Sequence, residues 1–337
     1  MKTILSFVVV VLLAQTTVAQ QKPQYTQYIL NNYILNPALS GIENYTDVKL
    51  SGRRQWVGLE GAPETFYFSV HSPIGKKDYK TTATSFNVPG ENPRGEAYWQ
   101  NYTASESHHG IGFFMVNDRT GLFSRFQANV SYAYHLGLSA RTNMAAGFSG
   151  GISKMGYNRS KATAVDPNDP ALGNGGDLYK ITPDLNAGIW IYSADYFVGM
   201  SAQQLIPQKV SFTGTSEGFS QVVHLFTTAG YRVGIDEDIN VLPSVMIKYI
   251  PSTGLAPQFD LNVKCQYRDL LWIGGSYRIK DGYAAMLGLN VANSFNIGYS
   301  YDITTTELNT VSRGTHEMVV GFLLGNRYGD TCPRNIW

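Results

Sequence analysis

Hydrophobic and polar residues alternate along one long stretch of the chain, from Phe123 to Leu138. Successive side chains of a β-strand point to opposite sides, so a period of two predicts a strand with one apolar and one polar face. The apolar face holds Phe126, Ala128, Val130, Tyr132, Tyr134, Leu136 and Leu138, and the polar face holds Arg125, Gln127, Asn129, Ser131 and His135. Such a strand can pack on a soluble core, or it can face lipid outward and water inward.

The same alternation recurs along the chain and predicts fourteen strands. From residue 257 to residue 303, four successive strands are joined by turns of about two or three residues, which is typical of an up-and-down meander. Pro243 weakens the strand that contains it, because proline cannot donate to a ladder. The predicted strands are 48–56, 65–74, 110–117, 123–138, 140–153, 184–192, 195–204, 224–234, 239–250, 257–268, 270–280, 282–291, 294–303 and 315–324.

The lengths of the connections alternate in a way that distinguishes membrane barrels from other β-proteins. Outer-membrane barrels have short periplasmic turns and longer external loops. With the N-terminus inside, the predicted turns at 139, 193–194, 235–238, 269 and 292–293 are periplasmic and short, whereas 57–64, 118–122, 154–183, 205–223, 251–256, 281 and 304–314 are external. The exception is the polar connection 75–109. Either the parity fails there or the segment is a periplasmic insertion, and we favour the insertion.

Composition supports a barrel in a membrane over a soluble β-sandwich. Charged residues make up 15% of the chain and aromatic residues 13%, with 22 tyrosines and 34 glycines, whereas soluble domains carry about 25% charge. A sandwich with so little charge would leave large apolar surfaces uncovered. The fold class that we expect is therefore all-β, a transmembrane outer-membrane β-barrel of about fourteen antiparallel strands. A net charge of +1 gives no argument for nucleic acid.

The N-terminus predicts a secretory signal peptide. Lys2 precedes an apolar run, and Thr17-Val18-Ala19 forms a small-x-small cleavage site. Sec-dependent export with cleavage near Ala19 would divide the chain into a signal peptide (1–19), an N-terminal segment (20–47), the β-barrel with its insertion (48–324) and a C-terminal tail (325–337). The segment 20–47 is too aromatic to be left in solvent, so we expect it to plug the barrel or to pack against the periplasmic rim.

The search for reactive chemistry is negative. The sequence lacks H-E-x-x-H, G-x-S-x-G and C-x-x-C, so we expect no catalytic, cofactor-binding or metal-binding residues. His108-His109 is interpreted as a solvated loop end, and Asp236-Glu237-Asp238 as a solvated turn. Cys265 and Cys332 are not expected to pair. Lumen charges such as Arg125, Asp260, Lys264, Arg268 and Arg278 could line a pore or pair with one another.

Three blocks of residues carry a resemblance to a known family. The run from Tyr28 through Asn36-Pro37-Ala38 to Gly41 resembles the opening of the PorP/SprF family, as do Arg53-x-Gln55-Trp56-x-Gly58 and Gly61-Ala62-Pro63-x-Thr65. Asn117-Asp118-Arg119-Thr120-Gly121 resembles the second block of that family. The family-motif positions, structural or partner-binding, are Asn36, Pro37, Ala38, Gly41, Arg53, Gln55, Trp56, Asn117, Asp118 and Gly121.

The resemblance implies an integral outer-membrane protein of Bacteroidota that works with the type IX secretion system and, in gliding species, with the export of surface adhesins. It implies three partners: the C-terminal domain of an exported protein, other type IX components, and outer-membrane lipid. The protein would help to secrete or to anchor its cognate partner. We expect the long loops 154–183 and 205–223 to contact the exported domain.

Two other functions stay open from the sequence. A transport channel of the fatty-acid-transporter type would also have fourteen strands and an N-terminal plug. A barrel hydrolase is the weaker alternative, because no residue is nominated as nucleophile or base.

Overall fold

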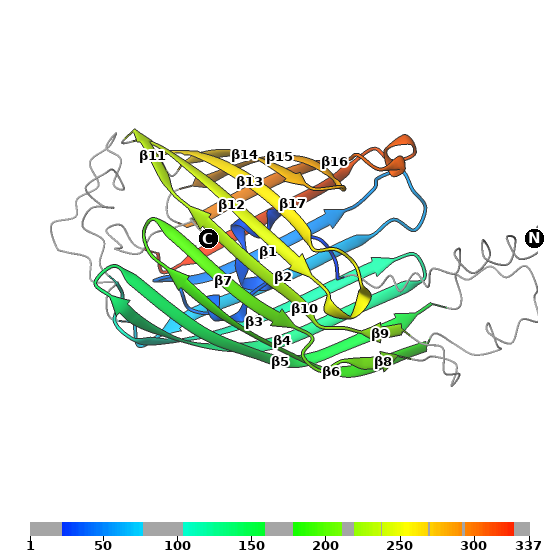
Figure 1. The fold of residues 1–337 in the computed structure, drawn as a ribbon, viewed down its shortest axis with the longest axis horizontal. Coiled ribbons are helices and arrows are strands. Elements are labelled where there is room, and N and C mark those ends of the chain that lie inside the picture. The colour runs from blue at the N-terminus through cyan, green and yellow to red at the C-terminus, as the bar shows by residue number, and fades with distance from the viewer. Residues whose placement is uncertain are drawn as a thin grey trace, which may run out of the picture.

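The chain forms a closed antiparallel β-barrel in its computed structural model (Figure 1). The structure describes residues 22–76, 104–158, 178–210, 219–236, 238–268, 270–291 and 294–326. Strands that follow one another in the wall are hydrogen-bonded neighbours, and the first and last strands, β1 and β17, pair to close the ring. The all-β barrel of antiparallel strands predicted from the sequence is confirmed.

Fourteen strands make up the wall, each overlapping its predicted position. They are β1 (Thr46–Arg54), β2 (Glu64–Ile74), β3 (His108–Thr120), β4 (Phe123–Ser139), β5 (Thr142–Tyr157), β6 (Leu178–Tyr192), β7 (Tyr196–Gln203), β10 (His224–Tyr231), β12 (Ile239–Tyr249), β13 (Gln258–Tyr267), β14 (Leu271–Arg278), β15 (Gly282–Val291), β16 (Phe295–Thr304) and β17 (Thr315–Leu324). The strand β6 begins at Leu178 rather than at 184, inside the predicted loop 154–183.

Three short strands lie outside this series. The strands β8 (Gln208–Val210) and β9 (Phe219–Gln221) pair only with each other. The strand β11 (Val233–Asp236) continues the line of β10 along β12. Pro243 of β12 lies where the partner changes, because Val241 pairs with β11 and Ser244 pairs with β10. The missing N–H of this proline therefore falls in a gap of the ladder.

The barrel has two unlike ends. The connections 55–63, 121–122, 158–177, 204–223, 250–257, 279–281 and 305–314 lie at one end, called here the loop end. It carries the short helices η5 (Pro251–Thr253) and η6 (Glu307–Thr310). The other, the turn end, carries 75–107, 140–141, 193–195, 232–238, 268–270 and 292–294. Since β2 and β3 are antiparallel neighbours, the long connection 75–107 joins them at the turn end.

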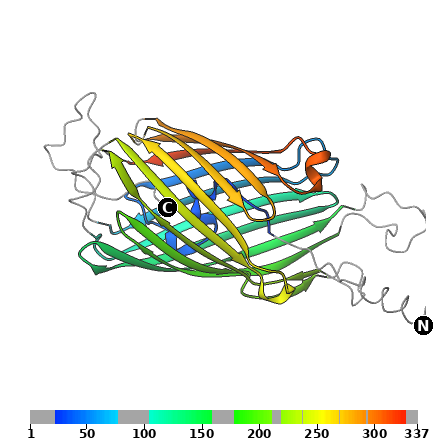
Figure 2. The ribbon, with the colours of Figure 1, turned by 45° about the horizontal axis from the view of Figure 1, so that its top comes forward.

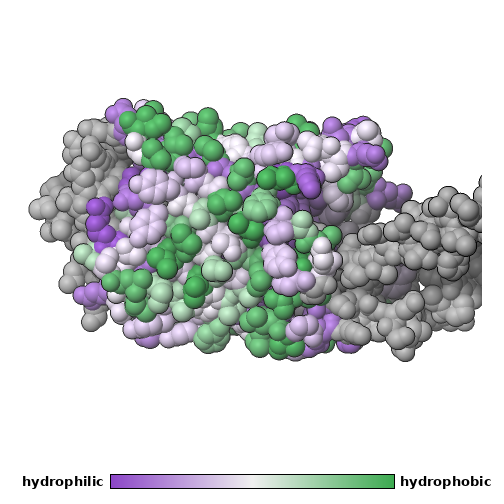
Figure 3. All heavy atoms as spheres, in the orientation of Figure 1, coloured by the Kyte–Doolittle hydropathy of each residue, from purple (hydrophilic) through white to green (hydrophobic). Residues whose placement is uncertain are grey.

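The outer wall is apolar between two polar borders. In β4, exposed or half-exposed Val130, Tyr132 and Tyr134 alternate with buried Asn129, Ser131 and His135, which confirms the two predicted faces. Figure 3 shows hydrophobic residues over the middle of the visible wall and hydrophilic ones near its ends. An apolar band of this kind is what a barrel presents to lipid. No helix among the described residues is long and apolar enough to cross a membrane.

Residues 22–45, called here the plug, lie inside the barrel, where Figure 2 shows this segment in blue, enclosed by strands. The plug folds into three single-turn helices, η1 (Gln27–Leu30), η2 (Asn32–Ile34) and η3 (Pro37–Leu39). Nearly all of its side chains are buried, both the apolar ones and those of Gln27, Asn31 and Asn36. Each large apolar side chain removed from water contributes roughly 1.5–3 kcal/mol, so packing against the wall holds the plug in place.

Candidate functional site: the plug and the rim groove

The plug runs the length of the barrel, from the loop end to the turn end. At the loop end, Lys22 Nζ donates to Gln203 Oε1 at 2.8 Å, and Gln203 is the last residue of β7. At the turn end, Lys76 Nζ donates to the carbonyl oxygen of Ile42 at 2.8 Å, shortly before β1 begins. The chain therefore passes through the lumen before it enters the wall, and it doubles back on the way, because Gln203 also donates to the carbonyl oxygens of Ile34 and Leu35. This path was not apparent from the sequence.

Arg53 of β1 joins the plug to the seam where the first strand of the wall meets the last two. Its guanidinium donates from Nη1 to Glu317 Oε2 and from Nη2 to Asp302 Oδ2, both at 2.9 Å. The same two carboxylates hold Thr26 of the plug: its backbone N–H donates to Glu317 Oε2 at 2.8 Å, and its hydroxyl donates to Asp302 Oδ2 at 2.5 Å. We call these four residues the Arg53 cluster. The first family-motif arginine is thus a buried structural residue.

The motif Asn36-Pro37-Ala38 seats the plug on the wall. Asn36 caps η3 by accepting from the backbone N–H of Ala38 at 3.0 Å, the usual stabilising role of asparagine before a helix. Its Nδ2 donates to the carbonyl oxygens of Ile189 and Met200 on β6 and β7. Gly147 and Gly188 are cross-strand neighbours beneath it. A Cβ on Gly147 would lie 2.7 Å from Ala38 Cα, so the wall has no room for a side chain at this position.

Three histidines hold the peptide of Ser40 and Gly41 where the plug approaches the turn end. The Gly41 N–H donates to His71 Nδ1 at 3.3 Å, and ring Nε2 atoms of His135 and His108 lie 2.8 and 3.2 Å from the carbonyl oxygens of Ser40 and Gly41. Gly41 has φ +71° and touches Gly110 of β3. A side chain at either glycine would separate plug from wall.

The interpretation of His108-His109 as a solvated loop end is wrong. The pair begins β3, so its two side chains point to opposite faces of the wall. His108 is buried in the lumen and stacks on His135 with ring centroids 4.4 Å apart. His109 faces outward, with Nδ1 2.6 Å from the Tyr132 hydroxyl. No group of three or more His, Cys, Asp or Glu residues in the described part of the chain is arranged to hold a metal ion.

Burial shifts the titration of the ionisable plug residues. Burial raises the pKa of the Tyr28 and Tyr33 hydroxyls, which Asn262 and Ser131 contact at 2.5 and 2.6 Å. Burial also lowers the pKa of Lys22 to about 8, although the carboxylate of Asp184 acts in the opposite direction. Loss of water around a charge favours the neutral form in each case.

The lumen charges pair with one another. Arg278 Nε donates to Asp260 Oδ1 at 3.1 Å, and Arg278 Nη1 donates to Asp281 at 2.9 Å and to Gln24 of the plug at 3.3 Å. Arg125 and Lys264 are buried on the same inner face. Arg268 departs from the expectation, because it follows β13 with φ +51° and pairs with Asp238 outside the lumen.

Small cavities separate the plug from the wall. Two of these, one beside Tyr28 and Lys264 and one beside Tyr25 and Lys248, have volumes of about 10 and 20 Å³. A single water needs roughly 10–15 Å³ on this measure. Each of these spaces thus has room for about one water and none for a solute.

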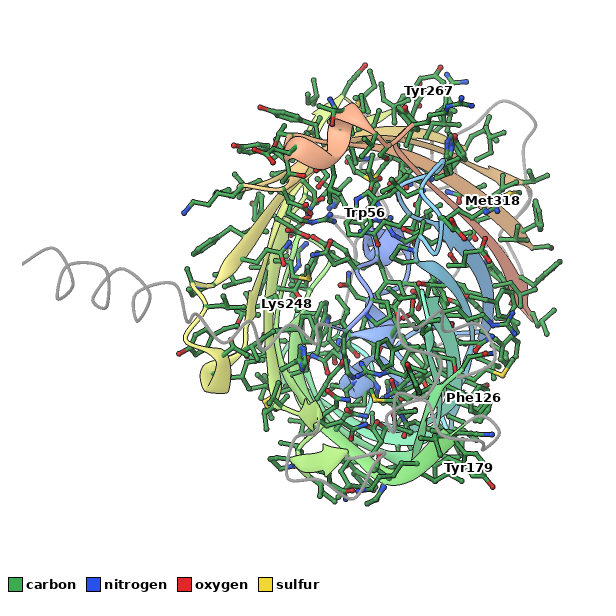
Figure 4. All side chains as sticks on the ribbon, turned by 90° about the vertical axis from the view of Figure 1, so that its right-hand side faces the viewer. Trp56, Phe126, Tyr179, Lys248, Tyr267 and Met318 are labelled. Carbon is green, nitrogen blue, oxygen red and sulfur yellow. The ribbon has the colours of Figure 1, made fainter. Side chains whose placement is uncertain are left out.

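A much larger hollow, of about 800 Å³, lies at the loop end. We call it the rim groove. The motifs between Arg53 and Thr65 meet the motif at residues 117–121 there although about 60 residues separate them in the sequence: Gln55, Gly58, Gly61, Ala62, Pro63, Asn117, Arg119 and Gly121 all line it. The ends of β4, β5 and β6 supply Phe126, Lys154 and Tyr179. Figure 4 looks onto this end and shows Phe126 and Tyr179 on the outside of the ring.

Two glycines position the walls of the groove. The N–H of Gly121 donates to the carbonyl oxygen of Gly61 at 2.8 Å, and both residues have positive φ, +57° and +69°. L side chains rarely adopt this conformation. A Cβ on Gly61 would lie 3.1 Å from Gly121 Cα. The motif at residues 117–121, which the sequence predicts to be a turn, therefore also supports the loop between β1 and β2.

The other motif residues of this end have structural contacts. Asp118 accepts from the hydroxyl of Thr65 at 2.6 Å, and the backbone N–H of Gln55 donates to the Pro63 carbonyl at 2.9 Å. Trp56, with φ +49°, donates its N–H to Thr315 Oγ1 at 3.1 Å. Asn117 and Arg119 face outward into the groove.

The described charges of the rim groove are mainly positive. Arg54 pairs with Glu64 at 2.9 Å, and Arg119 is exposed. Lys154 Nζ lies 4.5 Å from the centre of the Tyr179 ring, a cation–π contact. Apolar Leu122, Phe123 and Phe126 lie beside these charges.

Some sequence-based expectations concern residues outside the described ranges. These are the signal peptide 1–19, most of the insertion 75–109, the middle parts of the loops 154–183 and 205–223, most of the tail 325–337, and Cys332. Cys265 is a free cysteine on the outer face of β13.

Comparison with solved structures agrees with the fold. The Ralstonia pickettii toluene transporter TbuX resembles the chain with a TM-score of 0.50 at 9% identity, over 89% of this chain and 93% of that one. A Pseudomonas aeruginosa FadL homologue gives 0.45 at 9% identity, over 89% and 94%. At such identity the likeness concerns the barrel alone. No curated protein sequence matches the chain.

A family model decides the relationship. The model of the type IX secretion system membrane protein PorP/SprF matches residues 17–322. This range includes the plug, the Arg53 cluster and both sides of the rim groove. The chain therefore belongs to the PorP/SprF family of type IX secretion system membrane proteins, and its barrel is an outer-membrane barrel.

Proposed function

We propose that this barrel is a closed docking platform that binds the C-terminal domain of an exported protein and so assists its secretion or its anchoring at the cell surface. The observation that carries this proposal is the rim groove, where two family blocks distant in sequence form one hollow of about 800 Å³. Members of one family that bind the same kind of partner need a common binding surface. The two family motifs that line the rim groove would provide such a surface. The loop end would then face the cell exterior.

The filled lumen favours docking over solute transport. The plug is covalently continuous with β1 and is bound by the Arg53 cluster near the loop end and by three histidines near the turn end. A solute pathway would require breaking both sets of contacts. The exposed residues of the rim groove, in contrast, are available without any rearrangement of the described chain.

The rim groove offers cationic and aromatic side chains to a partner. Lys154 over Tyr179, together with Arg119, would meet acidic groups, and Phe126 and Leu122 would meet apolar ones. Aromatic and arginine side chains commonly supply most of the energy of a protein interface. The loops 154–183 and 205–223 are proposed to complete the contact, as are other type IX components.

The test is affinity purification of the tagged, full-length protein from detergent-solubilised membranes, with mass spectrometry. Lys154→Glu reverses a charge in the groove. Arg268→Glu is the matched control, because Arg268 also lies over a neighbouring tyrosine ring, 5.2 Å from the Tyr267 centroid, but at the turn end. We expect an exported type IX protein to co-purify with the wild type and with Arg268→Glu, and its recovery to fall about tenfold with Lys154→Glu, which is about 1.4 kcal/mol. Equal recovery with both variants would refute the groove as the docking site.

A further inference from the structure

One strand of the wall has a free edge next to the rim groove. The strand β6 pairs with β5 along its whole length, from Leu178 to Tyr192, but it pairs with β7 only from Ala187 to Tyr192. One further contact extends this ladder, in which the N–H of Leu205 donates to the carbonyl oxygen of Leu185 at 2.9 Å. Among the described residues, the loop-end part of β6 from 178 to 184 thus has a sheet neighbour on one side only.

The backbone parity of β6 identifies the groups that face this edge. In an antiparallel strand, alternate residues point their N–H and C=O groups to opposite neighbours. Because Leu185 points to the β7 side, Pro183, Ile181 and Tyr179 do so as well. Pro183 has no N–H to leave unpaired, as is usual for proline at an edge. The edge therefore presents the N–H groups of Tyr179 and Ile181, and three carbonyl oxygens.

The chain that should cover this edge turns away from it. If the β6–β7 register continued, Ile181 would lie opposite Gln208 and Tyr179 opposite Val210. The residues Gln208–Val210 form β8 instead and pair with β9. The change of direction occurs at Gln204, which has φ +58° and donates its N–H to Asn186 Oδ1 at 3.0 Å. A non-glycine residue in this conformation costs of order 1 kcal/mol, so surrounding contacts must maintain it.

Side-chain contacts hold the diverted hairpin on the inner side of the wall. Gln221 of β9 is buried, and its Oε1 accepts from the hydroxyl of Thr182 at 3.1 Å. Its Nε2 donates to the Ser153 hydroxyl at 3.3 Å. Both Thr182 and Ser153 are lumen-facing residues of β6 and β5. The hairpin is therefore fixed at the lumen face of β6 and does not pair with its backbone.

The free edge carries apolar side chains and is continuous with the rim groove. Tyr179 is 64% exposed and Ile181 is 54% exposed, both outward. Leu178 and Tyr179 also line the groove. An unpaired edge with exposed apolar side chains is a template for another strand, and proteins ordinarily protect such edges.

We propose that the exported protein docks by adding an extended β-strand to the edge of β6 at residues 179–183. This inference rests on the proposed function and names its binding mode. An extended polypeptide has backbone donors and acceptors at the same spacing as those of the β6 edge, so it can pair with them. The protein's own β8 does not occupy this edge, because the chain changes direction at Gln204. The side chains of the added strand would then lie against Tyr179 and Ile181 and enter the rim groove.

The test uses two substitutions at one position. Ile181→Pro removes the N–H that faces the edge and leaves the ladder to β5, whereas Ile181→Val keeps the N–H and the branched side chain. The exported protein that co-purifies with the wild type is purified, and its Kd is measured for both variants in detergent. We expect Ile181→Val to bind within about twofold of the wild type and Ile181→Pro to bind about tenfold more weakly, as for the loss of one backbone hydrogen bond and its neighbour.

Amide hydrogen exchange of the unmodified protein is the second measurement, and it does not depend on the folding of a variant. We expect the amides of Tyr179 and Ile181 to exchange rapidly in the free protein and to become protected in the complex. Protection already in the free protein would mean that a segment of the chain itself covers the edge, and this would overturn the inference. Equal Kd values for Ile181→Pro and Ile181→Val would also overturn the inference of strand addition, but they would leave the proposed docking intact. Failure of the wild type to bind any exported protein would instead remove the proposed function and this inference together.

Discussion

Arg53 and Glu317 are cross-strand partners at the seam where the first strand meets the last, with Nη1 and Oε2 2.9 Å apart. The pair closes the barrel and, through Thr26, fixes the plug inside it. The same contact therefore couples barrel closure to plug position. Because both charges are buried, the arrangement depends on every member being present.

Removal of Arg53 is expected to weaken the barrel and to loosen the plug. Arg53→Ala leaves the carboxylates of Glu317 and Asp302 buried without their cation, which costs about 3–5 kcal/mol. Arg54→Ala is the neighbouring control, since its exposed pair with Glu64 is worth at most about 1 kcal/mol. Urea unfolding in detergent measures both. Equal midpoints for the two variants would contradict the role of the Arg53 cluster.

Substitution of a wall glycine under the plug should displace it. Gly110→Ala places a Cβ against the carbonyl group of Ser40, whereas Gly52→Ala on β1 meets no atom within 4 Å. We expect Gly110→Ala to cost about 1–3 kcal/mol, as overpacking does, and to accelerate amide exchange around Gly41. Hydrogen-exchange mass spectrometry compares the two variants. If Gly110→Ala exchanges like Gly52→Ala, the plug does not depend on this contact.

The seating of the plug at the loop end should tighten as the pH rises above neutrality. The pKa of Lys22 is about 8 in the barrel and 10.5 when exposed, so the released state binds the proton more strongly. Stability from this group is therefore gained as the pH rises through 8 toward 10.5. The seating equilibrium should gain about tenfold between about pH 7 and pH 9. Amide exchange of the first plug residues, compared at each pH with Lys22→Met, measures this gain, and an equal pH response in both would contradict it.

The wall could be predicted from the sequence because its physics is local. Alternation with period two depends only on neighbouring residues, and so Val130 and Tyr132 could be assigned outward and Asn129 and Ser131 inward. The two ends of the barrel followed from connection lengths. The sequence predicts that Pro243 weakens its strand, because it shows the missing N–H but not the neighbouring strands. In the structure the proline lies opposite the gap between β10 and β11, where that N–H would have no partner.

The candidate site could be predicted only in part, because its contacts are distant in sequence. The motif residues were recognised, but nothing local shows that Gln55 and Asn117 line one groove or that Asn36 rests on Gly147 and Gly188. Thr26 also escaped notice, since its role arises from Glu317 and Asp302. His108 was misread because its partners Gly41 and His135 lie far along the chain. The glycines of β3, β5 and β6 were the available signal, as small residues on a polar strand face permit close approach.

Electrical recording from the full-length protein in planar lipid bilayers tests the central claim, a barrel closed by its own N-terminal segment, most directly. The account predicts no stable ohmic conductance from the wild type, because the plug fills the lumen and the two cavities described beside it each have room for about one water. It predicts conductance only when both sets of plug contacts are broken, as in Arg53→Ala combined with Gly110→Ala, and none after Arg54→Ala. A steady open channel in the wild type would contradict the closed barrel and favour a transport function.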